Sequence, residues 1–188
     1  MLFRSGNAAG DDILRGGDGN DLLAGYSAGD QFFGGNGSDT ASANGITQVV
    51  LTDSDYTSSG IVSANHSIES WTLIGTNNDD SIDASAWTGT GLYIHGYAGN
   101  DVLKGGAGND DLRGGTGNDI LEGNGGNDSL DWYDYGNAAG DDILRGGDGN
   151  DLLAGYSAGD QFFGGNGSDT ASANGITQVV LTDSDYTS

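Results

Sequence analysis

Aspartate is the residue type in this sequence whose abundance and spacing best support chemistry. The chain has 188 residues with 28 acidic side chains, and all of these except Glu69 and Glu122 are aspartates. In three stretches an aspartate returns every nine residues, beside glycine and asparagine. Glycine, asparagine and aspartate form tight turns, and carboxylate oxygens are ligands for hard cations. The pattern indicates aspartates that either form turns or bind metal ions.

A second candidate for chemistry is the stretch GYSAGD, which occurs twice and places Ser27 and Ser157 in the pattern G-x-S-x-G. That pattern surrounds a hydrolase nucleophile only where a helix follows the serine. Here another glycine-rich stretch follows, and a triad could draw only on His66 or His95. Two histidines without matched carboxylates also make a zinc site a poor interpretation. We interpret both serines as turn residues and expect no enzyme activity from this chain.

The composition excludes several classes of partner. The formal net charge is −23, and only five side chains are basic. Such a chain has no face that could bind phosphates, so we expect neither nucleic-acid binding nor attraction to anionic membranes. No apolar run is long enough to span a membrane, and the chain has no cysteine. Only 35% of the residues are hydrophobic, so self-repulsion should leave the chain disordered without counter-ions.

The chain repeats itself on two scales. Residues 6–58 recur unchanged as residues 136–188, which indicates about one and a half periods of a longer array. Within this long period, nine-residue units run through 7–42, 96–131 and 137–172. Every unit has aspartate at position six, and most have leucine at position eight. Units of this kind predict a solenoid in which each repeat stacks on its neighbours.

Each unit predicts a turn of six residues followed by a strand of three. Side chains alternate along a strand, so position eight should point inward and position nine toward solvent. Two units then make one coil, and the aspartates of alternate units should stack at the same edge. The predicted inner ladder is Leu14, Leu23, Phe32, Leu103, Leu112, Leu121 and Leu130, and the predicted outer residues are Arg15, Lys104, Arg113, Glu122 and Asp131.

The unit G-G-x-G-x-D-x-U-x closely resembles the RTX (repeats-in-toxin) family of calcium-binding β-rolls. The resemblance covers 12 units, in three runs of four. It implies an all-β fold, a right-handed parallel β-roll or β-helix solenoid. It also implies that one turn supplies its aspartate and the carbonyls of positions two and four to a Ca²⁺ ion. The turn two units later would supply its own aspartate and the carbonyls of positions one and three.

The resemblance thereby implies about six Ca²⁺ ions, held between pairs of aspartates. The pairs are Asp12 with Asp30, Asp21 with Asp39, Asp101 with Asp119, Asp110 with Asp128, Asp142 with Asp160, and Asp151 with Asp169. The implied backbone ligands are the carbonyls of Ala8, Gly10, Gly17, Gly19, Gly25, Ser27, Gly34, Asn36, Tyr97, Gly99, Gly106, Gly108, Gly114, Thr116, Gly123, Gly125, Ala138, Gly140, Gly147, Gly149, Gly155, Ser157, Gly164 and Asn166.

Some units depart from the family pattern. The unit 7–15 lacks glycine at positions one and two, and the unit 25–33 has Tyr26 at position two and Ala28 at position four, so we expect weaker sites there. Asp80 sits in a degenerate unit and could form another weak site. The alternative to calcium binding is a metal-free solenoid in which the aspartates only form turns. That alternative must stack carboxylates without a counter-ion in a strongly acidic chain.

We divide the chain into a first roll block (residues 1–42), a middle segment (43–95), a second roll block (96–172, interrupted at 132–136) and the start of a next β-helix segment (173–188). The middle segment has stretches rich in β-branched and apolar residues, which predict strands. We interpret it as wider β-helix coils in the same stack, and a separate small β-domain is the alternative. The expected core of these coils is Trp71, Leu73, Ile82, Trp87, Leu92 and Ile94. The interruption WYDY should fill the core where the coil changes width, or else form an exposed contact site.

Two functions fit these observations. The unchanged long repeat favours a structural or adhesive repeat of a secreted bacterial surface protein, fibre or filament, folding on Ca²⁺ and stacking on copies of itself end to end. The alternative is the calcium-triggered folding module of a toxin or hydrolase exported by type I secretion, whose catalytic part lies elsewhere. Both imply an extracellular, cell-surface location. An ice-binding solenoid is disfavoured, because Thr116 is the only threonine at position three.

Overall fold

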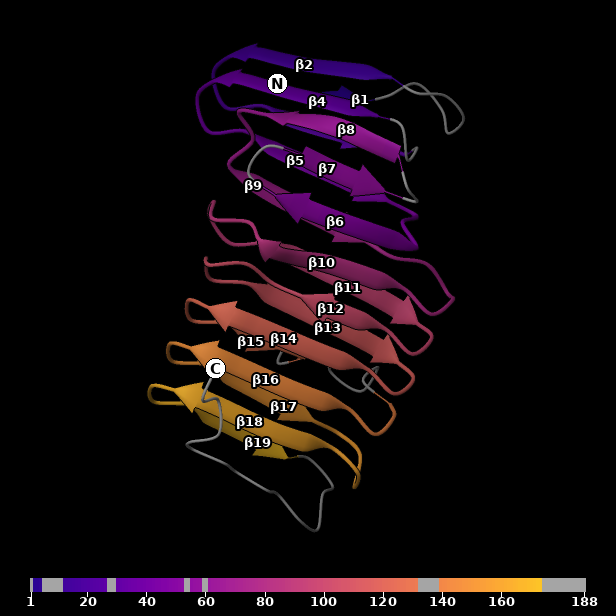
Figure 1. The fold of residues 1–188 in the computed structure, drawn as a ribbon, viewed down its shortest axis with the longest axis vertical. Helices are drawn as coiled ribbons and strands as arrows, with labels where there is room; N and C mark the ends of the chain where they lie inside the picture. The colour runs from indigo at the N-terminus through magenta and orange to yellow at the C-terminus, as the bar shows by residue number, and fades with distance from the viewer. Residues whose placement is uncertain are drawn as a thin grey trace.

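The computed structural model describes residues 2–4, 12–26, 30–52, 55–58, 61–131 and 139–173, and in these ranges all regular structure is β-strand. The strands form two sheets. Within each sheet, the strands follow one another from the N-terminal to the C-terminal end of the solenoid (Figure 1). The nine-stranded sheet has β1 (Leu2–Arg4), β3 (Leu22–Gly25), β5 (Thr40–Asn44), β9 (Ser70–Ile74), β11 (Tyr93–Ala98), β13 (Asp111–Thr116), β15 (Ser129–Leu130), β17 (Leu152–Gly155) and β19 (Thr170–Ala173).

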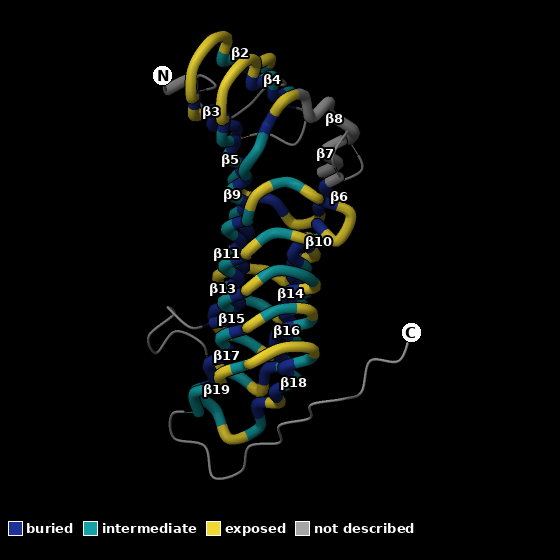
Figure 2. Tube along the Cα trace, turned by 90° about the vertical axis from the view of Figure 1, so that its left-hand side faces the viewer, coloured by how far each residue is buried: buried dark blue, intermediate teal, exposed yellow. Residues whose placement is uncertain are grey.

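The ten-stranded sheet is built from the even-numbered strands β2 to β18 together with β7. It contains, in spatial order, β18 (Gln161–Asn166), β16 (Ile143–Asp148), β14 (Ile120–Gly125), β12 (Val102–Lys104), β10 (Ser81–Ala86), β6 (Gln48–Thr52), β7 (Asp55–Ser58), β8 (Ile61–His66), β4 (Gln31–Asn36) and β2 (Ile13–Asp18). The two sheets face each other across a thin interior (Figure 2). Successive strands of the roll alternate between the two sheets. Neighbouring strands run parallel except around β7, as Leu14 beside Phe32 and Leu112 beside Leu130 illustrate. The predicted all-β parallel solenoid is confirmed.

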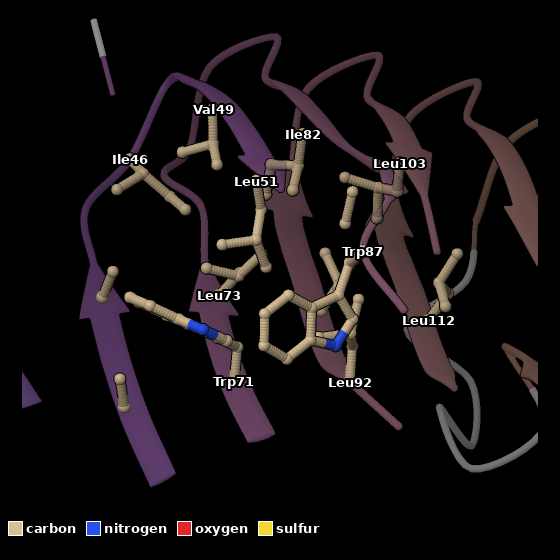
Figure 3. Packing of buried hydrophobic residues seen from close by; sticks show 14 of the residues in the cluster. Ile46, Val49, Leu51, Trp71, Leu73, Ile82, Trp87, Leu92, Leu103 and Leu112 are labelled. Carbon is tan, nitrogen blue, oxygen red and sulfur yellow. The ribbon is translucent and has the colours of Figure 1, made fainter. Parts of the chain in front are cut away.

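The interior is a single ladder of apolar side chains. All seven residues of the predicted inner ladder are buried, and the identical units add Leu144, Leu153 and Phe162. The middle segment widens this ladder with Trp71, Leu73, Ile82, Trp87 and Leu92 (Figure 3). Its strands belong to the same two sheets and the same hydrophobic cluster as the roll blocks.

The middle segment differs from plain wider coils in two respects. First, β7 runs antiparallel to both β6 and β8, so a meander interrupts the parallel sheet. Second, the register of the nine-stranded sheet shifts by two residues. Ala41, at position eight of its unit, pairs with Trp71, whereas Leu112, at position eight of a later unit, pairs with Ile94, which pairs with Leu73. The two roll blocks are therefore joined with an offset on this sheet.

The prediction for one outer residue is wrong. Asp131 was expected to face solvent from position nine, but it is fully buried with 0% exposure. Its φ of 54° turns the backbone out of the strand where the five-residue interruption begins. The side chain then points inward, and Oδ1 accepts the Gly114 N–H at 2.8 Å. Among the other expected outer residues, Arg15 is exposed, and Lys104, Arg113 and Glu122 are half-buried.

Candidate metal centre

The repeated aspartates form columns along the edges of the solenoid. In each predicted pair, the backbone N–H of the first aspartate donates to Oδ1 of the aspartate one coil later. The N–O distances are 2.9 Å for Asp12 and Asp30, 2.8 Å for Asp21 and Asp39, 2.7 Å for Asp101 and Asp119, 2.8 Å for Asp110 and Asp128, 2.9 Å for Asp142 and Asp160, and 3.0 Å for Asp151 and Asp169. The structure brings together all six predicted pairs.

The columns also continue where the sequence is irregular. Across the five-residue interruption, Asp119 N–H donates to Asp142 and Asp128 N–H to Asp151, each at 2.8 Å. Asp80 N–H donates to Asp101 at 2.7 Å, which joins the degenerate unit to the second block. In the second half of the molecule, one edge carries Asp80, Asp101, Asp119, Asp142 and Asp160, and the other carries Asp110, Asp128, Asp151 and Asp169.

The glycine at position one is required by the aspartate of its own turn. A Cβ on Gly123 would lie 2.2 Å from Asp128 Oδ2 and 2.6 Å from the Gly146 carbonyl oxygen of the next coil. Gly146 repeats the arrangement with Asp151 Oδ2 at 2.1 Å. Carboxylate and carbonyl oxygens of adjacent coils therefore converge over a glycine that has no side chain. Oxygen-lined space of this kind is what Ca²⁺ uses.

Two kinds of turn can be distinguished by the second carboxylate oxygen. In closed turns, Oδ2 accepts a backbone N–H of its own turn, as Asp80 does from Thr76 at 2.6 Å and Asp110 does from Gly106 at 2.7 Å. The turns of Asp30 and Asp160 are closed in the same way, through the N–H groups of Tyr26 and Ser157. A closed turn satisfies its aspartate without a metal ion, as the turn-forming alternative requires.

In open turns the residue at position two has positive φ. Gly35 (φ 114°), Tyr97 (φ 82°), Asn124 (φ 72°) and Gly147 (φ 116°) have this conformation. The buried Oδ2 atoms of the corresponding aspartates have no hydrogen-bond partner; these are Asp39, Asp101, Asp128 and Asp151. An ionised carboxylate is acceptor-only and costly to bury without a donor or cation. The turn-forming alternative leaves these atoms unexplained, and a Ca²⁺ ion fits them.

Burial disturbs the acidity of these carboxyl groups. Desolvation raises the pKa of Asp101 and Asp110 to about 6, of Asp142 to about 7 and of Asp128 to about 8. Neighbouring carboxylates in the column add to the rise, as Asp110 and Asp151 do for Asp128. A bound cation would reverse this effect, because it stabilises the ionised form.

The structure describes most of the residues whose carbonyls the family resemblance implies as ligands. Four of them lie outside the described residues, namely Ala8, Gly10, Ser27 and Ala138. Among the others, Gly106 and Gly108 belong to a closed turn that packs against the loop 87–91, where a Cβ on Gly108 would meet Gly91 N at 2.8 Å. The described part of the chain has no group of three or more histidine, cysteine, aspartate or glutamate side chains that could hold a metal ion. Backbone carbonyls are further oxygen ligands that Ca²⁺ accepts.

Asparagine at position five has a role that the sequence analysis missed. Its Oδ1 accepts the backbone N–H of the residue at position five in the next coil, as Asn100 does from Asn118 at 2.9 Å and Asn109 does from Asn127 at 2.7 Å. Asp79 begins one such ladder by accepting the Asn100 N–H at 2.7 Å. Asparagine occupies position five in six of the twelve units, and this recurrence was the available signal.

The other candidates are placed as structural residues. Ser157 lies in a closed turn, and its Oγ accepts a hydrogen bond from the Gly140 N–H, with an N–O distance of 3.2 Å. His95 lies on β11 between two tyrosine rings, with centroids 6.3 Å away at Tyr93 and 4.2 Å away at Tyr97. Ser27, the side chain of His66 and the stretch WYDY lie outside the described residues.

Comparisons with known proteins agree with the geometry. No curated protein matches the chain. In the part of the chain that the structure describes, no helix is long and apolar enough to cross a membrane. The family described as RTX calcium-binding nonapeptide repeat (4 copies) matches residues 8–41, 95–130 and 137–171, which together exceed half of the sequence. The chain therefore belongs to the RTX calcium-binding nonapeptide repeat family.

Proposed function

We propose that this chain is a calcium-folded structural repeat of a secreted bacterial surface protein, fibre or filament. The observation that carries the proposal is the set of open turns, in which buried carboxylate oxygens face carbonyl oxygens of the next coil and have no hydrogen-bond partner. Family membership supplies the identity of the ion as Ca²⁺. A repeat family of this kind forms structure and is not in itself catalytic.

Each ion would lie between two stacked turns. The two aspartates of a pair would bind it through their carboxylates, and the carbonyls of positions one to four would supply the remaining ligands. The three additional pairs, Asp80 with Asp101, Asp119 with Asp142 and Asp128 with Asp151, raise the number of expected sites from six to about nine. The ions would neutralise the carboxylate columns and so hold the coils together.

Calcium would also act as the folding trigger. With a net charge of −23 and a ladder only one apolar side chain wide in each roll strand, the coils have little besides metal binding to oppose electrostatic repulsion. A chain that is unfolded at low calcium and folds outside the cell would suit export. The same property supports the second candidate, a folding module of an exported toxin or hydrolase.

Backbone pairing along the stack supports the structural candidate. Among the described residues, β2 and β18 are the last strands of one sheet, and β1 and β19 are the last strands of the other. Parallel edge strands expose backbone donors and acceptors that a further copy or a continuing chain can cover. The identical long repeat would supply matching coils for such a filament.

Sedimentation velocity of this chain with millimolar calcium, and then with chelator, tests the proposal. We expect a slow, expanded species in chelator and a compact or elongated species in calcium. Growth to large, elongated species in calcium would support the filament, and a compact monomer would leave only the folding module. An identical compact species in both conditions would contradict calcium-dependent folding altogether.

A further inference from the structure

Glu69 is an acidic residue that the nonapeptide pattern does not explain. It is one of two glutamates among 28 acids and lies outside every residue range that the family matches. The other glutamate, Glu122, forms ion pairs on the outer surface with Lys104 at 3.1 Å and Arg145 at 3.4 Å. Glu69 lies instead in the short turn that joins β8 to β9, directly after the first roll block in the stack.

The carboxylate of Glu69 takes the place of the next aspartate in the column. Asp39 N–H donates to Glu69 Oε2 at 2.7 Å, just as Asp21 N–H donates to Asp39 Oδ1 at 2.8 Å. The backbones of the two turns are also paired, because Glu69 N–H donates to the Asp39 carbonyl at 3.1 Å. The column Asp21, Asp39 and Glu69 therefore extends one coil beyond the repeat.

The longer side chain compensates for a shorter turn. His66 pairs with Phe33 and Ser70 pairs with Thr40. Three residues lie between His66 and Ser70, whereas six lie between Phe33 and Thr40. One extra methylene allows glutamate to reach Asp39 from this shorter loop. Ser67 has a φ of 54°, in the left-handed region that a residue other than glycine enters only with backbone strain.

The Ser67 carbonyl completes the likeness to a repeat. A Cβ built on Gly34 would lie 1.9 Å from Ser67 O and 2.4 Å from Asp39 Oδ2. In a regular coil, a Cβ on Gly16 would meet Gly34 O and Asp21 Oδ2 in the same way, at 2.5 Å and 2.6 Å. Ser67 therefore offers its carbonyl oxygen where the position-one glycine of the next unit normally does.

Asp39 supplies the independent sign of a ligand. Its side chain is 0% exposed, its turn is open with Gly35 at φ 114°, and its Oδ2 has no hydrogen-bond partner. That oxygen faces the same space over Gly34 as the Ser67 carbonyl. We propose that Asp39, Glu69 and the Ser67 carbonyl hold a further Ca²⁺ ion where the first roll block meets the middle segment.

Calcium fits this site better than a smaller cation. Ca²⁺ accepts six to eight oxygens in flexible geometry, whereas Mg²⁺ demands a near-ideal octahedron. Exchanging an aspartate in a long turn for a glutamate in a short one is a change that only the flexible ion tolerates well. The ion would attach β9, and with it Trp71, to the end of the first roll block.

The inference rests on the proposed calcium function, and counting bound ions by native mass spectrometry tests the two separately. We expect Glu69→Gln to bind one Ca²⁺ fewer than the wild-type chain, because glutamine still accepts the Asp39 N–H but brings no charge. Glu122→Gln is the matched control and should keep the wild-type count. Absence of calcium from the wild type would contradict the proposed function, whereas equal counts in wild type and Glu69→Gln would overturn only the site at Glu69.

A second variant decides the case in which Glu69→Gln loses several ions by failing to fold. Glu69→Asp keeps the charge but shortens the reach, so it should retain every other ion and need at least about tenfold more calcium to fill one site. Calcium titration followed by native mass spectrometry measures this shift. A Glu69→Asp chain that fills all sites at wild-type calcium, or loses all of them together, would overturn the proposal.

Discussion

Two stretches of this molecule have identical sequences and different surroundings. Strand β2 and strand β16 both read ILRGGD, but β16 lies between β14 and β18, while among the described strands β2 has only β4 beside it. Ile13, in β2, is 58% exposed, and its counterpart Ile143, in β16, is half-buried. The inner leucines differ less, with Leu14 at 5% exposure and Leu144 at 0%.

The difference shows that the burial of a nonapeptide unit depends on the coils beside it as well as on its own sequence. Asp142 accepts the Asp119 N–H from the preceding coil, donates its own N–H to Asp160 of the next, and has its pKa raised by burial to about 7. In the part of the chain that the structure describes, Asp12 is paired with the following coil alone, through Asp30. In a solenoid, stability is a sum over neighbouring coils, so equal sequences should differ in stability. The two copies are therefore internal controls for each other.

The largest effect on folding stability should come from ionising all the aspartates of the columns in the absence of calcium. Burial raises the pKa of Asp101, Asp110, Asp128 and Asp142, so the folded chain without calcium binds more protons than the unfolded chain. Its stability is then greatest below about pH 4 and falls as the pH rises through about 6 to 8. In chelator, we expect the β-sheet circular dichroism signal to be strong near pH 5 and weak near pH 8.

The same titration in millimolar calcium provides the control. Calcium binds the ionised carboxylates and should hold the signal constant between about pH 6 and pH 8. A signal that grows with pH in chelator would contradict the buried columns. Hydrogen exchange can locate the transition, which should affect the second copy and its neighbours in the coils of residues 101–160.

The next largest effect compares Asp142→Asn with Asp12→Asn. Asparagine keeps the acceptor oxygen but removes the charge, and Asp142 contributes to two pairs where Asp12 contributes to one. A site filled at 100 times its Kd stabilises by about 2.7 kcal/mol, so the two variants should lose about 5 and about 3 kcal/mol. Calcium counts should fall by two ions and one ion. Equal losses in both assays would mean that the coils do not share their aspartates.

The sequence predicted the features that depend on the period. Nine-residue spacing was enough to place Leu112 inside, to assign two units to a coil and to pair Asp110 with Asp128, since a stacked solenoid makes these local and periodic. The columns across the interruption were also within reach, because Asp119 and Asp142 keep their place in the unit on either side of it.

The sequence could not predict features that depend on neighbouring coils. Gly106 belongs to a unit with the full GGAGND pattern, yet its turn is closed. The adjacent loop fills the space beside it, since a Cβ built on Gly106 would lie 2.5 Å from the Trp87 carbonyl oxygen. Asp131 is buried because the chain leaves the roll just after it. The antiparallel strand β7 and the two-residue register shift have no periodic signal at all.

A smaller difference in folding stability is expected between Leu144→Ala and Leu14→Ala. Both leucines belong to the inner ladder, but strands on both sides pair with the strand of Leu144, and one described strand pairs with that of Leu14. Leucine-to-alanine changes in a rigid core cost about 2 to 5 kcal/mol, and we expect Leu144→Ala near the upper end and Leu14→Ala near the lower end. Urea denaturation in saturating calcium measures both. The comparison breaks down if Leu14→Ala proves the more damaging.

The smallest effect concerns the glycine at position two of the same pair of strands. Gly17 and Gly147 both have positive φ, at 103° and 116°, so alanine should cost about 1 kcal/mol of backbone strain at either position. A Cβ on Gly17 would meet nothing within 4 Å, whereas a Cβ on Gly147 would lie 2.1 Å from the Asn124 carbonyl oxygen of the preceding coil. Gly147→Ala must therefore push that carbonyl aside, and we expect it to cost at least about 1 kcal/mol more than Gly17→Ala.

Thermal unfolding in calcium should resolve this difference, because both variants carry the same chemical change in strands of identical sequence. If Gly17→Ala is as costly as Gly147→Ala, then a part of this chain outside the described residues, or a second copy, must cover Gly17 in solution. Repeating the melt over a range of protein concentrations distinguishes these two sources. Only a coil supplied by a second copy would make the cost of Gly17→Ala grow with concentration, because association is then part of what the alanine disrupts.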